Sequence, residues 1–485
     1  MNRTVALALT ALTTTAYAIA PGPALLSVNQ AKKVAKSVIS ADQCRNILTF
    51  IASDALLGRD TPSPGLDAAA EFLAYNLRKW GAKPGGDNGS FFQKVTLYRS
   101  QLDTNSAVIV GGTTTLRYGS QFVVSRGQGD LNGPAVFIDN EVGTTDVKGK
   151  IVFMAESVSL AEDRVAVDKG AVAVIRDQGA TGADWTNFAR SFNRPVGGFG
   201  LTAPNATAQA PRILMESTAF ASIKSSPMVR LLVERKTETA TTQNVVAIVE
   251  GSDPKLKSEY VALGAHLDHI GVRSTGDGDR IFNGADDDGS GTTAILAIAE
   301  AALTAKERAK RSLLFVWHFG EEKGLWGSSY FTNNPTVPIT SIVAQLNIDM
   351  CGRSRMAGDT NPRNATLTDP NSIYVIGTTM MSTRLGELVH KTNADFLKVN
   401  YDPRYDDPKD PNRFYYRSDH YNYAQKGIPI CFWFDGVHED YHGVGDEVSK
   451  IDFNKIEKTA QTVFVTAVAV ANEPVRPPVD KPLRP

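Results

Sequence analysis

Two adjacent glutamates, Glu321 and Glu322, follow an uninterrupted apolar run over residues 313–317. Such a run is typical of a strand that is buried on both faces. Neighbouring carboxylates at the end of a buried strand repel each other, and a fold keeps such a pair when a cation shares the site. A solvated turn would explain an isolated pair equally well. The interpretation as a charged site therefore depends on partners elsewhere in the chain.

Histidines and aspartates follow three further apolar runs. His266 and Asp268 end the first of them, and Asp349 and His442 follow the other two. Strand alternation places His266 and Asp268 on one side, where the carboxylate can accept the proton of the far imidazole nitrogen. A lone histidine at a strand end is more often structural. Several such residues at successive strand ends indicate a shared site.

Three consecutive aspartates, Asp286, Asp287 and Asp288, precede a predicted helix that begins near Gly291. Acidic side chains there could simply cap the helix. A calcium-binding EF-hand loop is excluded, because its closing glutamate position holds Ala297. Three acids held together against their own repulsion fit a site that holds several positive charges.

The donor atoms of this set suit a transition metal. Two histidines with several carboxylates favour zinc, with manganese or cobalt as substitutes. The three cysteines, Cys44, Cys351 and Cys431, contain no Cys-x-x-Cys spacing, so a structural zinc knot is excluded. They allow at most one disulfide, whose members the sequence leaves open. No Gly-x-Ser-x-Gly elbow and no cysteine nucleophile are evident, so metal-activated water is the hydrolytic mechanism that the sequence supports.

The elements that must position these residues alternate between strand and helix from Thr242 onward. Strands are predicted over 244–249, 260–264, 313–317, 342–350, 373–377 and 428–434, and helices over 291–309, 385–393 and 453–471. This rhythm predicts an α/β fold with a mostly parallel or mixed central sheet flanked by helices. Ligands are then expected outside the carboxyl ends of the strands.

The rest of the chain divides by composition. Residues 1–18 have the pattern of a secretory signal peptide. Residues 31–100 are expected to be the amino-terminal part of the main domain and look helical over 31–81. Residues 101–234 consist of short β-like runs without a cluster of catalytic candidates. Residues 235–472 hold the main α/β part, and the proline-rich residues 473–485 are expected to be a disordered tail.

The net charge and the amino-terminal sequence limit the classes of partner and the location that we expect for this protein. The 51 basic residues nearly cancel the 52 acidic ones without a long run of one sign, which argues against nucleic acid or anionic membrane as the main partner. The signal peptide predicts a secreted or periplasmic protein without a stable membrane span. A retained membrane anchor is disfavoured, because the apolar stretch is short and interrupted by threonines.

The order of the motifs resembles the co-catalytic zinc aminopeptidases of peptidase family M28. The matching motifs are His266-x-Asp268, Gly284 to Gly291, Glu321-Glu322-x-Gly324-Leu325-x-Gly327-Ser328, Asn347-x-Asp349 and His442, with support from Leu57 to Asp60 and Arg417 to His420. The insertion around Gly149 to Val152 resembles the β-rich protease-associated domain that such enzymes often carry. Together the likeness covers about residues 40–470.

This resemblance implies a role for each matched residue. Two zinc ions are expected per chain, with Asp287 as their bridge and Glu321 as general base. His266 and Asp349 would complete one zinc site, Glu322 and His442 would complete the other, and Asp268 would orient His266. Asp419 and His420 would either contact substrate or support the site from behind. The resemblance also implies a cis peptide bond between Asp287 and Asp288.

Three functions follow as alternatives. The first is a secreted aminopeptidase that removes amino-terminal residues from peptides. The second is a carboxypeptidase or a glutaminyl-cyclase-like relative, although such cyclases use a single zinc and here both His266 and Asp349 are present. The third is a non-enzymatic module that only binds partners, against which the complete ligand set argues. The side-chain preference, the end of the peptide that is read, and the oligomeric state stay open.

Overall fold

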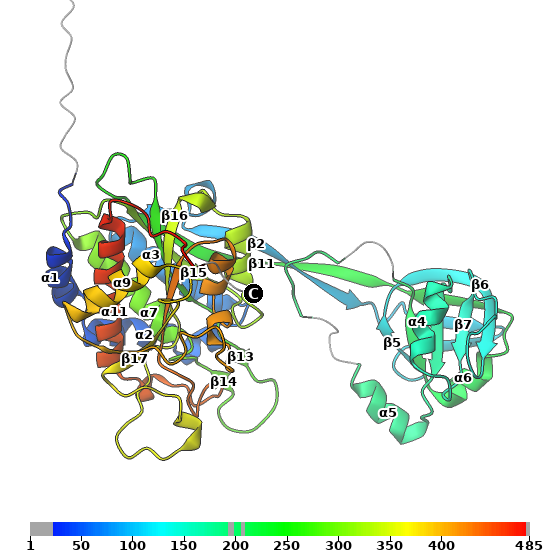
Figure 1. Ribbon diagram of the computed structural model, residues 1–485. Coiled ribbons are helices and arrows are strands. Elements are labelled where there is room, and N and C mark those ends of the chain that lie inside the picture. Colours follow the sequence, from blue (N-terminus) through cyan, green and yellow to red (C-terminus); the bar gives the residue numbers. More distant parts are fainter. Residues whose placement is uncertain (1–22, 193–197, 205–208, 482–485) are drawn as a thin grey trace, which may run out of the picture. The chain divides into compact units, whose positions relative to one another are not determined.

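The computed structural model describes residues 23–192, 198–204 and 209–481. The predicted signal peptide lies outside these residues. The chain divides into two units: unit 1 contains the chain up to Gln93 and from Gln243 onward, and unit 2 contains Lys94–Thr242 (Figure 1). The predicted insertion, 101–234, falls within unit 2, whose limits extend several residues further on each side.

A nine-stranded mixed sheet, which lies mainly in unit 1, has the order β1-β11-β15-β12-β16-β19-β17-β18, with β2 paired to β11. Its strands are β1 (Lys83–Pro84), β2 (Phe92–Leu102), β11 (Arg235–Val249), β12 (Tyr260–His266), β15 (Ser312–His318), β16 (Ile342–Ile348), β17 (Ser372–Ile376), β18 (Asn400–Asp402) and β19 (Ile430–Phe434). The four central strands, β15, β12, β16 and β19, are parallel to one another, whereas β11 is antiparallel to β15 and β17 is antiparallel to β19. The predicted α/β class with a mixed sheet is confirmed.

Helices flank this sheet (Figure 1). They are α1 (Val28–Val38), α2 (Ala41–Ile51), α3 (Pro64–Lys79), α7 (Gly289–Thr304), α8 (Trp326–Asn333), α9 (Thr383–Ala394), α10 (His420–Gln425) and α11 (Phe453–Asn472). Helix α7 packs against α1, α2, α11 and the central strand β12. It is built mainly from small and apolar residues and is buried on nearly all sides, so it lacks a polar face. This position fixes its amino-terminal end at the strand edge.

The two central strands β12 and β15, which lead into site residues, are mostly apolar and almost entirely buried. All seven residues of β15 are buried, as predicted for a strand covered on both faces, and six of the seven residues of β12 are buried as well. Burial of side chains such as Phe315 and Trp317 supplies ~1.5–3 kcal/mol each to the hydrophobic stabilisation of the core. The polar residues that follow these strands are therefore held on a rigid base.

Unit 2 contains an eight-stranded sheet in the order β4-β3-β10-β6-β7-β8-β9-β5. Its strands are β3 (Val108–Gly111), β4 (Thr114–Arg117), β5 (Phe122–Arg126), β6 (Gly129–Ile138), β7 (Ile151–Met154), β8 (Ala173–Asp177), β9 (Arg212–Met215) and β10 (Met228–Val233). Three helices accompany them, α4 (Ala161–Asp168), α5 (Gly182–Arg190) and α6 (Ser217–Ile223). The unit has its own apolar core. Its assignment as a protease-associated domain stays a prediction.

The segment after α11 differs from the expected disordered tail. Residues 473–481 form no helix or strand but contact the rest of unit 1. Arg476 donates hydrogen bonds to the carbonyl oxygens of Thr340 (3.0 Å) and Ile342 (2.9 Å). The amide of Asp480 donates to the carbonyl of Met381 at 3.1 Å. These backbone acceptors hold a segment whose composition alone predicts disorder.

Two further features bear on the sequence predictions. All three cysteines are buried and free, so none of them pairs with another. Among the described helices, none has both the length and the apolar character needed to cross a membrane.

Candidate metal centre

The predicted ligands converge at the carboxyl edge of the parallel strands. His266 is the last residue of β12, Asp349 directly follows β16, and Glu322 lies four residues beyond β15. Asp287 lies two residues before α7, and His442 lies in the loop between β19 and α11. The cis peptide bond between Asp287 and Asp288 is present, as the resemblance implied.

The two oxygens of Asp287 face two different histidines. Its Oδ1 lies 3.2 Å from Nε2 of His266, and its Oδ2 lies 3.2 Å from Nε2 of His442. Asp349 Oδ1 is 3.6 Å from the same nitrogen of His266, and Glu322 Oε2 is 3.1 Å from that of His442. Two ligands of one tetrahedral zinc, each at 2.0–2.1 Å from the ion, are about 3.3–3.4 Å apart. The spacing therefore fits two metal sites that share Asp287.

Orphaned polar atoms support this arrangement. His266 Nε2, Asp287 Oδ2 and Glu322 Oε1 are buried without a hydrogen-bond partner. A buried polar atom without a partner costs about 1–3 kcal/mol, so native proteins rarely leave several together. A bound cation would satisfy the orphaned nitrogen and carboxylate oxygens, and the donor set of imidazole and carboxylate suits zinc.

Protonation within the cluster reflects the same crowding. Burial opposes the charge on Asp287, but the adjacent imidazoles of His266 and His442 hold the pKa of its carboxyl well below the usual range. Burial also opposes protonation of His442, yet the adjacent carboxylates of Asp287 and Glu322 raise its pKa to about 10. The cluster thus favours positive charge between its carboxylates, which bound metal ions would also supply.

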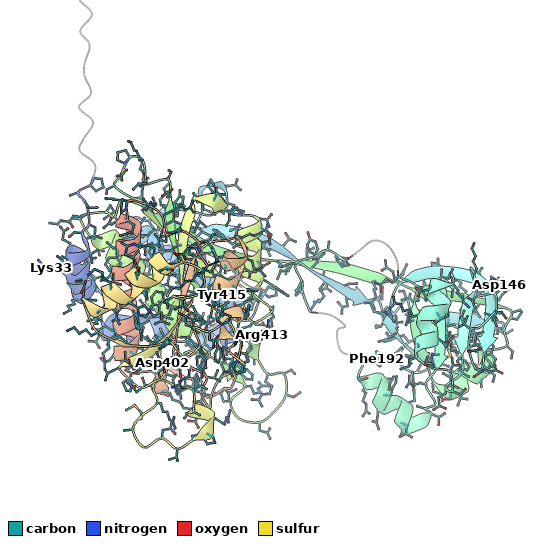
Figure 2. All side chains as sticks on the ribbon, in the orientation of Figure 1. Lys33, Asp146, Phe192, Asp402, Arg413 and Tyr415 are labelled. Atoms are coloured by element: carbon teal, nitrogen blue, oxygen red, sulfur yellow. The ribbon has the colours of Figure 1, made fainter. Side chains whose placement is uncertain are left out.

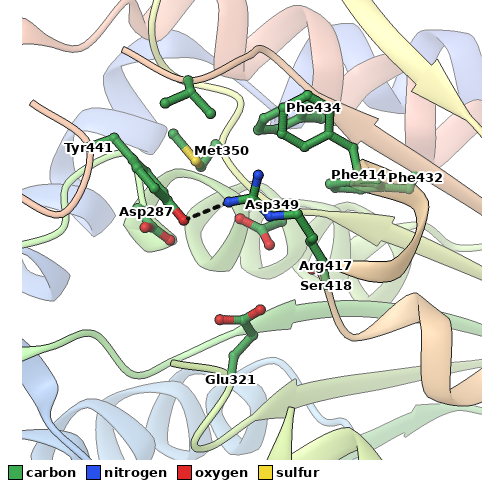
Figure 3. Close-up of a pocket in the computed structure, with 11 residues that line it drawn as sticks. Asp287, Glu321, Asp349, Met350, Phe414, Arg417, Ser418, Phe432, Phe434 and Tyr441 are labelled. Carbon is green, nitrogen blue, oxygen red and sulfur yellow. Dashed lines mark hydrogen bonds between the residues drawn. The ribbon is translucent and has the colours of Figure 1, made fainter. Parts of the chain in front are cut away.

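Glu321 occupies a different position from Glu322. Its Oε2 lies 4.0 Å from His266 Nε2, and its side chain lines a pocket beside the ligands (Figure 3). Burial raises the pKa of the Glu321 carboxyl well above its ordinary value. The nearby His266 acts in the opposite direction, and the negative charge of Asp349 adds to the increase. A carboxylate that points into a pocket and is not needed as a ligand is placed to move protons.

Two groups of three residues each bring possible metal-ligand atoms within 4.8 Å of one another. They are His266, Asp288 and Asp349, and His269, Asp287 and Glu322. Asp288 is already occupied, because its carboxylate accepts hydrogen bonds from the amides of His266 (3.1 Å), Gly291 (2.8 Å) and Met350 (3.1 Å). It therefore caps α7 and joins the ligand loops.

His269 was missed by the sequence reasoning. It is fully buried, and its Nδ1 lies 2.7 Å from Glu322 Oε1, shorter than the spacing between ligands of one ion. It thus contacts the Glu322 oxygen that does not face His442. A Cβ on Gly284, whose φ is +55°, would come within 2.5 Å of the His269 ring, so only glycine fits there. The sequence signal that could have indicated His269 is its position three residues after His266.

Asp268 connects two loops. Its carboxylate Oδ1 accepts a hydrogen bond from the amide of Glu321 at 3.0 Å and lies 3.7 Å from Nδ1 of His266. The backbone carbonyl of Asp268 is nearer to that nitrogen, at 3.1 Å. The carbonyl of its own loop therefore orients His266, and the orienting role of the Asp268 carboxylate stays a prediction.

Asp419 and His420 lie behind the pocket. Asp419 Oδ2 is 3.3 Å from Nδ1 of His318, and both side chains are fully buried. His420 shares a hydrogen bond of 2.8 Å with the carbonyl of Tyr415, and its ring stacks on Phe432 with centroids 4.4 Å apart. Neither lines the pocket beside Glu321. Of the two predicted roles, the geometry favours support over substrate contact.

Arg59 connects the loops that carry His266 and Asp287. Its side chain is 1% exposed and donates hydrogen bonds to four carbonyl oxygens, those of Ile51, Leu267, Asn283 and Gly284. Leu267 follows His266, and Gly284 lies three residues before Asp287. One guanidinium thus connects the loops that carry these two ligands.

The pocket beside the ligands is lined by apolar side chains as well as charged ones (Figure 3). Its lining residues are Asp287, Glu321, Asp349, Met350, Phe414, Arg417, Ser418, Phe432, Phe434, Val437 and Tyr441. The apolar members could receive an apolar part of a substrate next to the metal ligands.

Fold and ligand set together define an α/β metalloprotein whose centre lies at the carboxyl ends of parallel strands. Residues 244–467 match peptidase family M28 and contain all the ligand candidates. For this part of the chain, the match confirms the resemblance to peptidase family M28 found in the sequence.

Individual relatives are more distant. The chain is 25% identical over 272 residues to a probable leucine aminopeptidase 2 of Trichophyton verrucosum, covering 50% of this chain and 48% of that one. It is 26% identical over 271 residues to a probable leucine aminopeptidase 2 of Aspergillus oryzae, covering 51% and 48%. The chain thus spans about half the length of the curated relatives it matches.

A solved structure, the aminopeptidase from Aneurinibacillus sp. strain AM-1, is 19% identical with a TM-score of 0.50 and covers 94% of this chain and 100% of that chain. This likeness shows the fold.

Proposed function

We propose that this protein is a dizinc exopeptidase, specifically an aminopeptidase that hydrolyses amino-terminal residues from peptides. The observation that carries the proposal is the placement of Asp287, whose two oxygens face His266 and His442 separately. The match of residues 244–467 to family M28 and the similarity to leucine aminopeptidases over half the chain support it. His266 and Asp349 would hold one zinc, and Glu322 and His442 the other.

The residues around the metal ligands would have separate roles in the hydrolysis. When bound, the two zinc ions would polarise the peptide carbonyl and lower the pKa of a shared water. Glu321 accepts the proton of the attacking water and delivers it to the leaving amine, for which its raised pKa is suited. Asp268 and His269 hold His266 and Glu322 in place. The apolar pocket wall receives the substrate side chain.

The alternatives predict other outcomes. A carboxypeptidase or a glutaminyl-cyclase-like enzyme would use the same fold, but a single-zinc cyclase has no need of two complete ligand sets. A partner-binding module has no need of Glu321 in a pocket. A mixed peptide library incubated with and without chelator identifies the terminus that is trimmed. Trimming at the carboxyl end, or none in either condition, would replace the aminopeptidase assignment.

The sharpest test separates the two neighbouring glutamates. Glu321→Gln leaves both ligand sets intact, so two zinc ions per chain should remain while turnover falls by ~10²–10⁴. Glu322→Gln replaces a charged ligand by a weak neutral one, so zinc should be lost from one site and activity should partly recover with added zinc. Zinc content is measured beside turnover for both variants. Zinc loss in Glu321→Gln with retention in Glu322→Gln would reverse the roles.

The proposed location is outside the cytoplasm, in the medium or the periplasm. The support is the sequence pattern of residues 1–18. Amino-terminal sequencing of exported protein should give a start near Ile19. Recovery of intact Met1 from exported material would contradict it.

A further inference from the structure

Arg417 is a cation in a pocket that is otherwise lined by apolar and acidic side chains. It lines this pocket together with Asp287, Glu321 and Asp349. Within the part of the chain that the structure describes, it forms no ion pair with a carboxylate, and its side-chain contacts are with Tyr441 and Phe414. An arginine at such a site usually pairs with a carboxylate in a bidentate manner. Here that position is open to a substrate.

The guanidinium is nevertheless held in place. Its Nη2 donates a hydrogen bond to the Tyr441 hydroxyl at 3.3 Å, and its central carbon lies 5.1 Å from the Phe414 ring centroid. Figure 3 shows the side chain extending across the pocket toward Tyr441. A group that is oriented before binding loses less conformational entropy when a ligand arrives. The remaining donors of Arg417 are exposed to the pocket and solvent.

The charge of Arg417 stays available once the centre is loaded. Two divalent ions would bring four positive charges against the three negative charges of the proposed ligand carboxylates, those of Asp287, Glu322 and Asp349. These carboxylates would then exert little net attraction on Arg417. At the same time, the apolar wall favours an aliphatic or aromatic stem. The pocket is thus suited to a substrate part with an apolar stem and an anionic end.

We propose that Arg417 binds a carboxylate of the substrate and makes the enzyme prefer peptides that carry an acidic group near the scissile bond. The inference rests on the proposed function and adds a substrate class to it. Two groups of a peptide offer this chemistry: the side chain of an amino-terminal acidic residue, and the carboxyl terminus of a dipeptide. The test has one arm for each.

Two pairs of peptides differ by one carboxylate only. Glu-Leu-amide against Gln-Leu-amide varies the side chain, and Leu-Leu against Leu-Leu-amide varies the carboxyl terminus. We expect the zinc-loaded protein to favour the acidic member of one pair by about 10–100-fold in kcat/KM, as for hydrogen bonds to a charged group. The pair that shows the preference identifies the source of the carboxylate.

The variants assign this preference to the guanidinium. Arg417→Met should reduce the ratio to about one, and Arg417→Lys should leave an intermediate ratio, because lysine keeps the charge but lacks the planar fork. Arg413→Met is the matched control: Arg413 (labelled in Figure 2) lies on the same loop and also packs on an aromatic ring, that of Tyr416 at 4.9 Å, but it does not line the pocket. Its ratio should equal that of the wild type.

Three results would overturn the proposal. They are no acid preference in either pair, a preference that survives in Arg417→Met, and an equal loss in Arg413→Met. If no peptide is cleaved at all, the proposed function fails separately. The same four peptides then serve as uncleaved ligands in calorimetry. Tighter binding of the acidic member and its loss in Arg417→Met would uphold the role of Arg417, and equal affinities would refute it.

Discussion

Replacing Arg59 by methionine tests whether one buried guanidinium holds the metal loops. Methionine keeps an apolar stem of similar length but removes all five N–H donors. The four acceptors lie at 2.6 Å (Ile51), 2.8 Å (Leu267), 2.7 Å (Asn283) and 3.0 Å (Gly284). After the change, these buried carbonyls have lost a charged donor that no neighbouring side chain replaces.

The expected loss is large. A buried acceptor that loses its partner costs about 1–3 kcal/mol, so four of them at the lower limit give about 4 kcal/mol of unfolding free energy. Burial lowers the pKa of Arg59 to about 10, while Asp268, Asp446, Asp288 and Asp287 act in the opposite direction, so the group is charged at neutral pH. Removing this charge also weakens the loops that carry His266 and Asp287.

The assay is urea unfolding of the metal-free protein, with zinc affinity measured separately. Arg59→Met should lower both the unfolding free energy and the zinc affinity. Arg59→Lys, which keeps the charge with fewer donors, should recover zinc affinity more than stability. A loss below about 1 kcal/mol together with unchanged zinc affinity in Arg59→Met would show that the loops hold their geometry without this residue.

Two further predictions concern pH and the insertion. Burial lowers the pKa of His420 from 6.5 to about 4, so between these values the unfolded chain binds a proton that the folded chain does not, and stability should fall by about 3 kcal/mol as the pH drops from 6.5 to 4. His420→Gln should flatten this part of the curve of unfolding free energy against pH, and an unchanged slope would exclude His420 as its source. Replacement of residues 94–242 by a two-residue turn should leave zinc content at the wild-type value, because unit 2 contributes none of the proposed ligands. Loss of both zinc ions from such a variant that still folds would disprove this partition.

The strand ends could be predicted because each ligand directly follows an apolar run. His266 and Asp349 needed only strand assignment and the rule that parallel strands end at one edge. The start of α7 was predicted two residues late, because the predicted helix began after the acidic stretch, whereas Asp288 caps it and Gly289 already lies in its first turn. The helix also ends before its predicted limit, since Ala305 is extended.

The support of the site could not be predicted in the same way. Arg59 binds backbone carbonyls that lie more than two hundred residues away for three of its four bonds, and backbone acceptors leave no mark in a sequence. His269 was passed over because no alternation rule applies to a loop. The limits of unit 2 differ from the composition boundary, because β2 and β11 continue from one unit into the other.

The discontinuous make-up of unit 1 has a consequence for biosynthesis. Helix α1 packs against α11, and α2 packs against α7, so the earliest helices find their partners only after most of the chain has been made. Unit 2, by contrast, is one continuous segment and is complete when Thr242 emerges. Because domains fold as units during synthesis, we expect unit 2 to fold first, while α1, α2 and α3 wait with exposed apolar faces. The metal loops can close only when Arg59, translated early, meets residues 267 and 283–284 on the later part of the chain.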